Sequence, residues 1–342
     1  MTTSAPTKLA AAAMSILLRL EPERAHRLAL AGLKLLRPFW PPLETPASVA
    51  VNCAGLHFAH PVGIAAGFDK DGDYLDALGA IGFSHIEVGT VTPDPQAGNP
   101  KPRLMRIPAA TALVNRMGFN SKGIAYVVQQ LQRSRFRGIR GVSIGKNAVT
   151  PIESAVDDYL ICFRIVYSLA DYVAVNISSP NTSKLRELQT VEGLGQLIGP
   201  LQEEGAHLAR EHGKRTPIFV KLAPDLTEDQ LTSLALAIRR LGVDGVIATN
   251  TTVALDEVGT VPAIYQGGGL SGEPLHRKSL AVISQLRAEL GSDFPIIGVG
   301  GITTAKAALA TLTAGANVVQ LYTGFIYRGP ALLNEILSML RC

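Results

Sequence analysis

The chain has only three cysteines, Cys53, Cys162 and Cys342, and they lie far apart in the sequence. They provide neither a disulfide framework nor a metal-ligand spacing, so we expect the protein to work in a reducing compartment. The seven histidines include no HExxH or comparable pair. We therefore expect no metal site.

Long apolar runs and dense basic runs are also missing. The N-terminal apolar stretch is interrupted by Arg19, Glu21 and Pro22, well short of the ~20 residues that a bilayer-crossing helix needs. Lys8 alone is a weak basic start for a secretory signal, and we expect no signal peptide. The net charge of +4 suits an acidic small molecule or an anionic membrane surface. The four arginines of segment 133–140 are interpreted first as a solvated surface and second as a ligand patch, and no nucleic-acid partner is expected.

What the chain does have is a repeating pattern of short, buried-type strands followed at once by polar residues or glycine. We expect eight such strands, over 61–65, 83–88, 141–144, 172–175, 218–220, 246–248, 296–299 and 318–321. Most are separated by stretches of helical period, for example 157–168, 228–241 and 303–314. Alternating strands and helices predict an α/β fold with parallel pairing, and eight units close as a (β/α)8 TIM barrel. Residues 49–58 are expected to form a hairpin over one end.

Function in such a barrel lies at the carboxyl ends of the strands. The segment Asn176-Ile177-Ser178-Ser179-Pro180-Asn181-Thr182 follows the fourth strand, and Pro180 keeps it in a turn. A single serine in a turn is most often a capping residue. Because polar residues follow the other strands in the same register, the catalytic interpretation outweighs the structural one.

Glycine-rich strand ends predict a phosphate-bearing planar cofactor. Gly300-Gly301 and Tyr322-Thr323 follow the seventh and eighth strands, where this barrel usually binds phosphate, and 267–272 is expected to be a flexible loop beside them. Ala65-Ala66-Gly67 would leave a flat surface for a ring system. Flavin mononucleotide is preferred to pyridoxal phosphate. Lys221 would be a cation beside the flavin N1–C2=O edge in the first case and a Schiff-base lysine in the second.

The other half of the expected pocket is rich in amides. Asn115, Asn176, Asn181 and Asn250 are accompanied by Lys70. Four carboxamides suit a ring of alternating N–H and C=O groups, and the lysine suits the carboxylate of the same ligand.

Six segments together closely resemble class 2 dihydroorotate dehydrogenase, the membrane-associated, quinone-reducing family of pyrimidine synthesis. They are 21–26, 66–70, 87–93, 115–120, 176–182 and 298–302. The resemblance covers nearly the whole chain. It implies oxidation of (S)-dihydroorotate to orotate in UMP biosynthesis, with one non-covalent FMN as hydride acceptor and a membrane quinone as final electron acceptor.

The resemblance also assigns residues. Ser179 matches the catalytic base that takes the C5 proton while hydride leaves C6, a position that holds cysteine in class 1 relatives. Orotate-binding positions are matched by Lys70, Asn115, Arg116, Met117, Gly118, Phe119, Asn176, Asn181, Asn250 and Thr251. Flavin contacts are matched by Ala66, Gly67, Phe68, Asp69, Lys70, Thr90, Asn176, Lys221, Thr249, Ser271, Gly272, Gly300, Gly301, Tyr322 and Thr323.

One position departs from the family pattern. Where the family usually has a flavin-contacting asparagine, this chain has Ser143. Serine is shorter, so we expect a water in the gap, or an altered affinity or potential of the flavin. Ser143 is kept as a further predicted flavin contact.

The N-terminal segment is expected to be a separate module. Residues 1–44 would form two short helices, one with Leu9 and Leu20 and one opened by Pro22, while 45–342 form the catalytic barrel. The module is expected to pack on the barrel, to insert its apolar side into a membrane surface, or to do both. By resemblance it forms a quinone tunnel, with His26 and Arg106 near the quinone carbonyls.

The expected location is the cytoplasmic side of the cell membrane, as a peripheral protein. No transit peptide for the inner mitochondrial membrane is evident.

Three alternatives make different predictions. A class 1 relative using fumarate or NAD predicts cysteine at position 179 and no N-terminal hairpin, and the sequence disagrees with both. A pyridoxal-dependent barrel would have a different absorption spectrum. A membrane-docked binding protein without turnover would keep its function when Ser179 is replaced by alanine.

Overall fold

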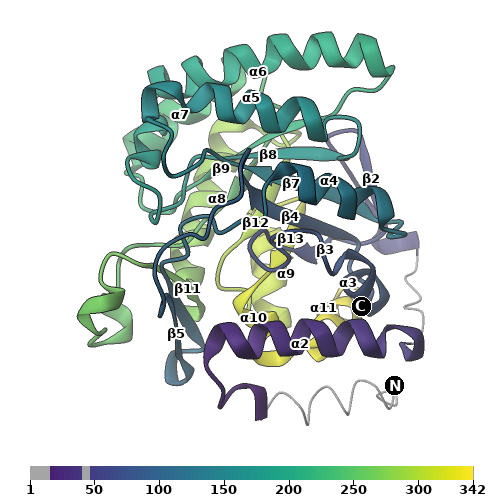
Figure 1. Ribbon diagram of the computed structural model, residues 1–342, viewed down its shortest axis with the longest axis vertical. Helices are drawn as coiled ribbons and strands as arrows, with labels where there is room; N and C mark the ends of the chain where they lie inside the picture. The colour runs from purple at the N-terminus through teal and green to yellow at the C-terminus, as the bar shows by residue number, and fades with distance from the viewer. Residues whose placement is uncertain (1–15, 41–46, 342) are drawn as a thin grey trace.

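The computed structural model describes residues 16–40 and 47–341, and its centre is a closed barrel of eight parallel strands (Figure 1). The strands follow one another around the barrel in the order β3 (Val62–Ile64), β4 (His85–Val91), β7 (Ile139–Ile144), β8 (Tyr172–Asn176), β9 (Ile218–Leu222), β10 (Gly245–Ala248), β12 (Ile296–Val299) and β13 (Val318–Leu321). These are the eight strands that the sequence predicts. The TIM-barrel prediction is confirmed.

Helices cover the outside of the barrel. They are α3 (Leu75–Ile81), α4 (Ile124–Arg133), α5 (Ala155–Val166), α6 (Val191–His212), α7 (Glu228–Arg240), α8 (His276–Leu290), α9 (Ala305–Thr313), α10 (Thr323–Arg328) and α11 (Pro330–Leu340). Figure 1 shows α5, α6 and α7 side by side on one flank. Helix α7 begins with a capping box. The Thr227 hydroxyl accepts from the Gln230 backbone N–H, and the Gln230 side chain accepts from the Thr227 backbone N–H.

Large rings fill the amino-terminal end of the barrel because glycines make room for them. A Cβ on Gly63 would lie 2.3 Å from the His85 ring, and one on Gly141 would lie 2.2 Å from the Tyr172 ring. The predicted hairpin is present as β1 (Val51–Cys53) and β2 (Leu56–Phe58), which pair antiparallel. Its Phe58 packs edge-on against His85, with ring centroids 5.1 Å apart. The hairpin therefore closes this end, and the opposite end is left for a site.

A second sheet of three antiparallel strands adjoins the carboxyl-terminal mouth. It consists of β5 (Leu104–Ile107), β6 (Ala112–Asn115) and β11 (Gly269–Gly272), with β6 in the middle. The prediction of a flexible loop over 267–272 is wrong here, since Gly269–Gly272 pairs in register with Ala112–Asn115. The glycines serve close packing: a Cβ on Gly269 would lie 2.0 Å from the Thr251 hydroxyl oxygen.

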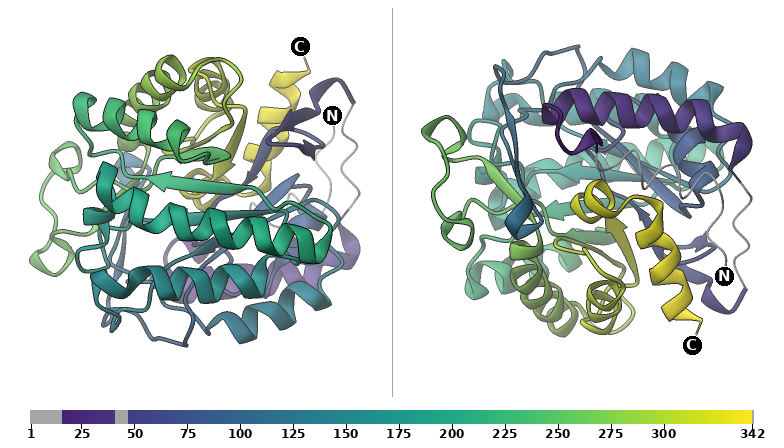
Figure 2. Two further views of the ribbon diagram at one scale, coloured as in Figure 1. Left: turned by 90° about the horizontal axis from the view of Figure 1, so that it is seen from above. Right: turned by 90° about the horizontal axis from the view of Figure 1, so that it is seen from below.

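The N-terminal module contributes α2 (Pro22–Leu36), which lies along one edge of the barrel close to α10 and α11 (Figures 1 and 2). The Glu21 carboxylate caps it by accepting from two backbone N–H groups of the first turn, and Pro22 occupies the first position. The helix ends before Pro38, as predicted. The predicted start near Leu9 and the domain boundary at 44/45 lie outside the described residues. Within the described part of the chain, no helix combines the length and apolarity needed to cross a bilayer.

Candidate active site

The turn after β8 places Ser179 at the mouth of the barrel. The side chain of Asn176 organises the turn, because its amide oxygen accepts from the Ser178 backbone N–H at 3.2 Å and the Ser178 hydroxyl at 3.0 Å. The Ser179 Oγ accepts the Asn181 backbone N–H at 3.2 Å. Ser179 is 6% exposed and lines a cavity at the mouth. Its hydroxyl proton is therefore available for a partner inside that cavity.

The four predicted asparagines all line this cavity, which we call the mouth cavity. They form two pairs of contacts. Asn250 Nδ2 donates to the Asn176 Oδ1 at 3.3 Å and to the Ser178 hydroxyl at 2.9 Å. Asn181 Nδ2 donates to the Asn115 Oδ1 at 3.0 Å. Because the amides are held by one another, they present donors and acceptors in fixed directions.

Most other predicted residues lie in the same walls. From the substrate set these are Lys70, Met117, Gly118, Phe119 and Thr251, and from the flavin set Ala66, Gly67, Thr90, Lys221, Thr249, Ser271, Gly272, Gly300, Gly301, Tyr322 and Thr323. They come from both barrel strands and the second sheet. The barrel topology therefore brings together side chains separated by more than 200 positions, from Ala66 to Thr323.

Four residues predicted for the substrate or the flavin do not line the mouth cavity. Phe68 and Asp69 face the neighbouring cavity beneath α2, where the Asp69 carboxylate accepts the Asp73 and Tyr74 backbone N–H groups. Arg116 turns away and donates to the Ile264 carbonyl at 2.7 Å. Ser143 is fully buried behind Thr90.

The position of Ser143 follows from its short side chain. Its hydroxyl lies 2.9 Å from the Thr90 hydroxyl, which accepts Asn176 Nδ2 at 2.8 Å. Ser143 therefore connects to the wall of the mouth cavity through Thr90, and its direct contact with a flavin stays a prediction.

An arginine that the sequence analysis missed joins two loops of the site. Arg186 Nε donates to the Ser178 carbonyl at 3.0 Å, and Nη2 donates to the Thr251 carbonyl at 2.9 Å. Its Nη1 pairs with Asp225 at 2.9 Å, and Lys278 pairs with the other oxygen of that carboxylate at 2.8 Å. Burial alone would raise the pKa of Asp225, but hydrogen bonds, foremost from Lys278, outweigh it and lower the pKa. The carboxylate thus stays charged and holds Arg186 in place.

The glycine pair after β12 shapes the end of the cavity predicted for phosphate. Gly300 and Gly301 have φ angles of 122° and 69°, in the region that favours glycine. Beside them, the Ser271 and Thr323 hydroxyls lie 2.8 Å apart. Side-chain-free backbone with adjacent hydroxyls is chemically suited to an anion.

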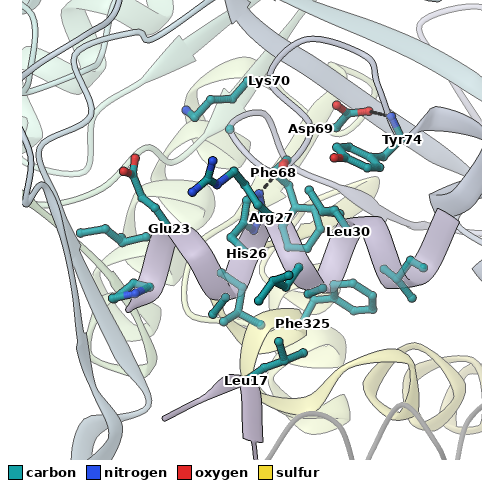
Figure 3. Close-up of a pocket in the computed structure, with 18 of the residues that line it drawn as sticks. Leu17, Glu23, His26, Arg27, Leu30, Phe68, Asp69, Lys70, Tyr74 and Phe325 are labelled. Carbon is teal, nitrogen blue, oxygen red and sulfur yellow. Dashed lines mark hydrogen bonds between the residues drawn. The ribbon is translucent and has the colours of Figure 1, made fainter. Parts of the chain in front are cut away.

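A second cavity, of about 600 Å³, lies between α2 and the barrel (Figure 3). We call it the α2 cavity. It shares Gly67, Lys70, Met117 and Tyr322 with the mouth cavity, so the two adjoin. Much of its wall is apolar, including Leu17, Leu30, Phe68 and Phe325.

His26 and Arg106, the two residues predicted for the quinone site, both line the α2 cavity. His26 Nε2 lies 2.8 Å from the Phe68 carbonyl oxygen, so this nitrogen carries the proton (Figure 3). Burial lowers the pKa of His26 to about 4, and the ring is neutral at pH 7. Arg106 donates to the carbonyls of Leu17 and Leu20 and ties the start of the described chain to β5.

Lys70 stands at the boundary between the two cavities. Burial lowers its pKa to about 8, with the nearby Asp71 opposing the shift. Below that pH the side chain is a cation. It is therefore able to bind an anionic group from the mouth cavity. In the part of the chain described here, no cluster of three or more His, Cys, Asp or Glu could hold a metal ion.

Comparison with known proteins identifies the family. A family model described as dihydroorotate dehydrogenase matches residues 48–341. The chain belongs to the dihydroorotate dehydrogenase family. The class resemblance stated from the sequence is confirmed by relatives named dihydroorotate dehydrogenase (quinone). That of Chromobacterium violaceum is 51% identical over 92% of this chain and 89% of the relative, and that of Aeromonas hydrophila is 49% identical over 95% and 98%.

Solved structures agree with this assignment. A crystal structure of DHODH from Eimeria tenella in complex with ferulenol superposes with a TM-score of 0.85 at 36% identity, covering 93% of this chain and 90% of that chain. At this identity the similarity extends beyond the fold.

Proposed function

We propose that the protein oxidises dihydroorotate to orotate in the mouth cavity. Flavin mononucleotide would accept the hydride there, and a quinone in the α2 cavity would be the final electron acceptor. The observation that carries the proposal is the junction of the two cavities at Lys70 and Tyr322. A polar, amide-lined space for the pyrimidine and an apolar space for the quinone share one wall. Such an arrangement lets one bound flavin meet both substrates in turn.

The residues present fit a flavin. Lys221 supplies a buried cation, and the Gln320 Oε1 is a buried acceptor without a hydrogen-bond partner among the described residues. Both line the mouth cavity, so a ligand with an N–H donor and an electron-rich edge satisfies them. Gly300, Gly301 and Thr323 would hold its phosphate. When bound, the flavin supplies a two-electron hydride acceptor.

The chain's own residues would bind the substrate and move its proton. Lys70 holds the carboxylate, and the asparagines bind the ring amides. Ser179 Oγ would take the proton from C5 as hydride leaves C6 for the flavin, and it would pass its own hydroxyl proton on to water, because a neutral hydroxyl cannot hold both protons. The Asn181 N–H that reaches this oxygen at 3.2 Å would stabilise it while its own proton departs. Arg186 keeps the Ser178 carbonyl in place and so fixes the catalytic turn.

The N-terminal module would deliver the quinone from a membrane surface. Leu28, Leu35 and Phe39 are 55%, 76% and 72% exposed, although they are large and apolar. Residues seven apart on α2, such as Leu28 and Leu35, share one helix face. A bilayer surface would cover them, with the apolar α2 cavity opening towards it. We therefore propose a peripheral membrane protein, and its bacterial quinone-dependent relatives support the cytoplasmic side of the cell membrane.

A half-reaction tests the chemistry directly. The Ser179→Ala variant, loaded with flavin and mixed anaerobically with dihydroorotate, should lose ~10²-fold or more in the rate of flavin reduction while orotate binding is largely kept. Ser284, exposed on α8, provides the matched control, since Ser284→Ala should reduce flavin at the wild-type rate. Equal rates in wild type and Ser179→Ala would contradict the assignment of the base.

A further inference from the structure

A charged pair is buried inside the barrel, below the mouth cavity. Glu87 on β4 lies 3.2 Å from Lys221 on β9, measured from Oε1 to Nζ. The Glu87 residue is 0% exposed and Lys221 is 4% exposed. Removing two charges from water is costly even when they pair, so a hydrophobic pair would be expected if stability were the only demand. The pair therefore needs a functional reason.

The other oxygen of Glu87 is held by two more donors. Its Oε2 accepts the Tyr172 hydroxyl at 3.0 Å and the Gln320 Nε2 at 2.9 Å. Gln320 Nε2 also lies 3.0 Å from the Tyr172 hydroxyl. Both carboxylate oxygens are thus bound, and the group has little freedom to move.

The four residues fall into two layers. Lys221 and Gln320 line the mouth cavity, while Glu87 and Tyr172 lie behind them in the barrel interior. Gln320 donates its amide N–H to Glu87, and its Oε1 is a buried acceptor without a partner in the described chain. Glu87 therefore holds two residues of the cavity wall without lining the cavity itself.

We propose that Glu87 is a positioning residue that fixes Lys221 and Gln320 and limits the positive charge that Lys221 presents to the bound flavin. This inference rests on the proposed function. A bound flavin would supply a hydride acceptor, and a hydride carries one negative charge to it. The Lys221 ammonium would stabilise that charge, and the Glu87 carboxylate 3.2 Å from the ammonium would offset part of its attraction. Glu87 thereby keeps the reduction potential lower than an unpaired Lys221 would set it, which favours passing electrons on to the quinone.

The test measures the midpoint potential of the flavin-loaded Glu87→Gln variant against a reference dye, without substrate or turnover. Glutamine keeps the size and an acceptor oxygen but removes the charge. The equilibrium should move at least tenfold towards reduced flavin, an upward shift of ~30 mV for a two-electron couple. Tyr172→Phe is the matched control, because it removes one donor to the same carboxylate without changing its charge. Its shift should be much smaller.

An unchanged potential in flavin-loaded Glu87→Gln would overturn the proposal. If that variant does not retain flavin, a crystal structure of the wild-type holoprotein decides instead. Lys221 within hydrogen-bond distance of Glu87 supports the proposal, and Lys221 withdrawn from Glu87 refutes it. Failure of the proposed function gives a different result, since dihydroorotate would then leave the wild-type flavin oxidised whatever its dye-measured potential.

Discussion

Arg186 links the turn that carries Ser179 to the loop that carries Asn250, and its removal should slow catalysis without emptying the site. We consider Arg186→Lys, which keeps the charge opposite Asp225. A lysine has one point of contact where arginine has a planar fork, so it cannot reach Asp225 and both backbone carbonyls together. The Ser178 and Thr251 carbonyls, now bound at 3.0 and 2.9 Å, would lose their donors.

The magnitude follows from these two contacts. A hydrogen bond from a charged donor contributes ~1.5–3 kcal/mol when buried. Arg186 has a side-chain exposure of 24%, so water replaces part of each contact and about 1 kcal/mol remains for each. A loss of about 2 kcal/mol in the placement of Ser179 corresponds to a ~30-fold slower proton and hydride transfer.

Stopped-flow absorbance under anaerobic conditions measures this step as the rate of flavin bleaching at saturating dihydroorotate. Arg164→Lys is the matched control. Arg164 makes a comparable fork contact with Glu204, at 2.9 and 3.0 Å, but on the outer surface of α5 and α6. It should leave the rate unchanged. The reasoning is refuted if Arg186→Lys bleaches as fast as the control while orotate affinity is also unchanged.

Two further predictions concern the cavity walls and the membrane face. Because burial lowers the pKa of Lys70 to about 8, its cation is lost as pH rises through that value, so orotate titrations should give a dissociation constant that rises above pH 8 and is flat below it. A flat profile up to pH 9.5 would remove Lys70 from the role of carboxylate ligand. Leu35→Glu should reduce co-sedimentation with anionic vesicles severalfold, whereas Leu236→Glu, 57% exposed on α7, should not. Equal sedimentation of the two variants would argue against membrane contact through α2.

The sequence predicts the barrel well because each strand is a compact apolar run with a polar or glycine end. It does not predict the second sheet, in which Ala112–Asn115 pairs with Gly269–Gly272 across a separation of more than 150 positions. A glycine-rich strand has no alternating side-chain pattern, and its pairing depends on tertiary contacts alone. This is why 267–272 is read as a flexible loop.

The same reasoning separates the predicted site residues from the missed ones. Lys70 and the asparagines directly follow strands or belong to family motifs, so their place in the sequence indicates that they are site residues. Arg186 lies beyond the turn, in the short 3-10 helix Leu185–Leu188, and Glu87 lies inside a strand. Both act through partners from distant segments, which only the folded chain brings together. Ser143 is indicated by resemblance alone, and only the folded chain shows that its hydroxyl meets that of Thr90.

The most direct test of the account is an anaerobic titration of the purified wild-type protein with dihydroorotate, followed by addition of a quinone. The account predicts that dihydroorotate bleaches the bound flavin in proportion to the amount added, and that the quinone restores the absorbance. A protein that carries no flavin, or a flavin that stays oxidised in excess dihydroorotate, would contradict it.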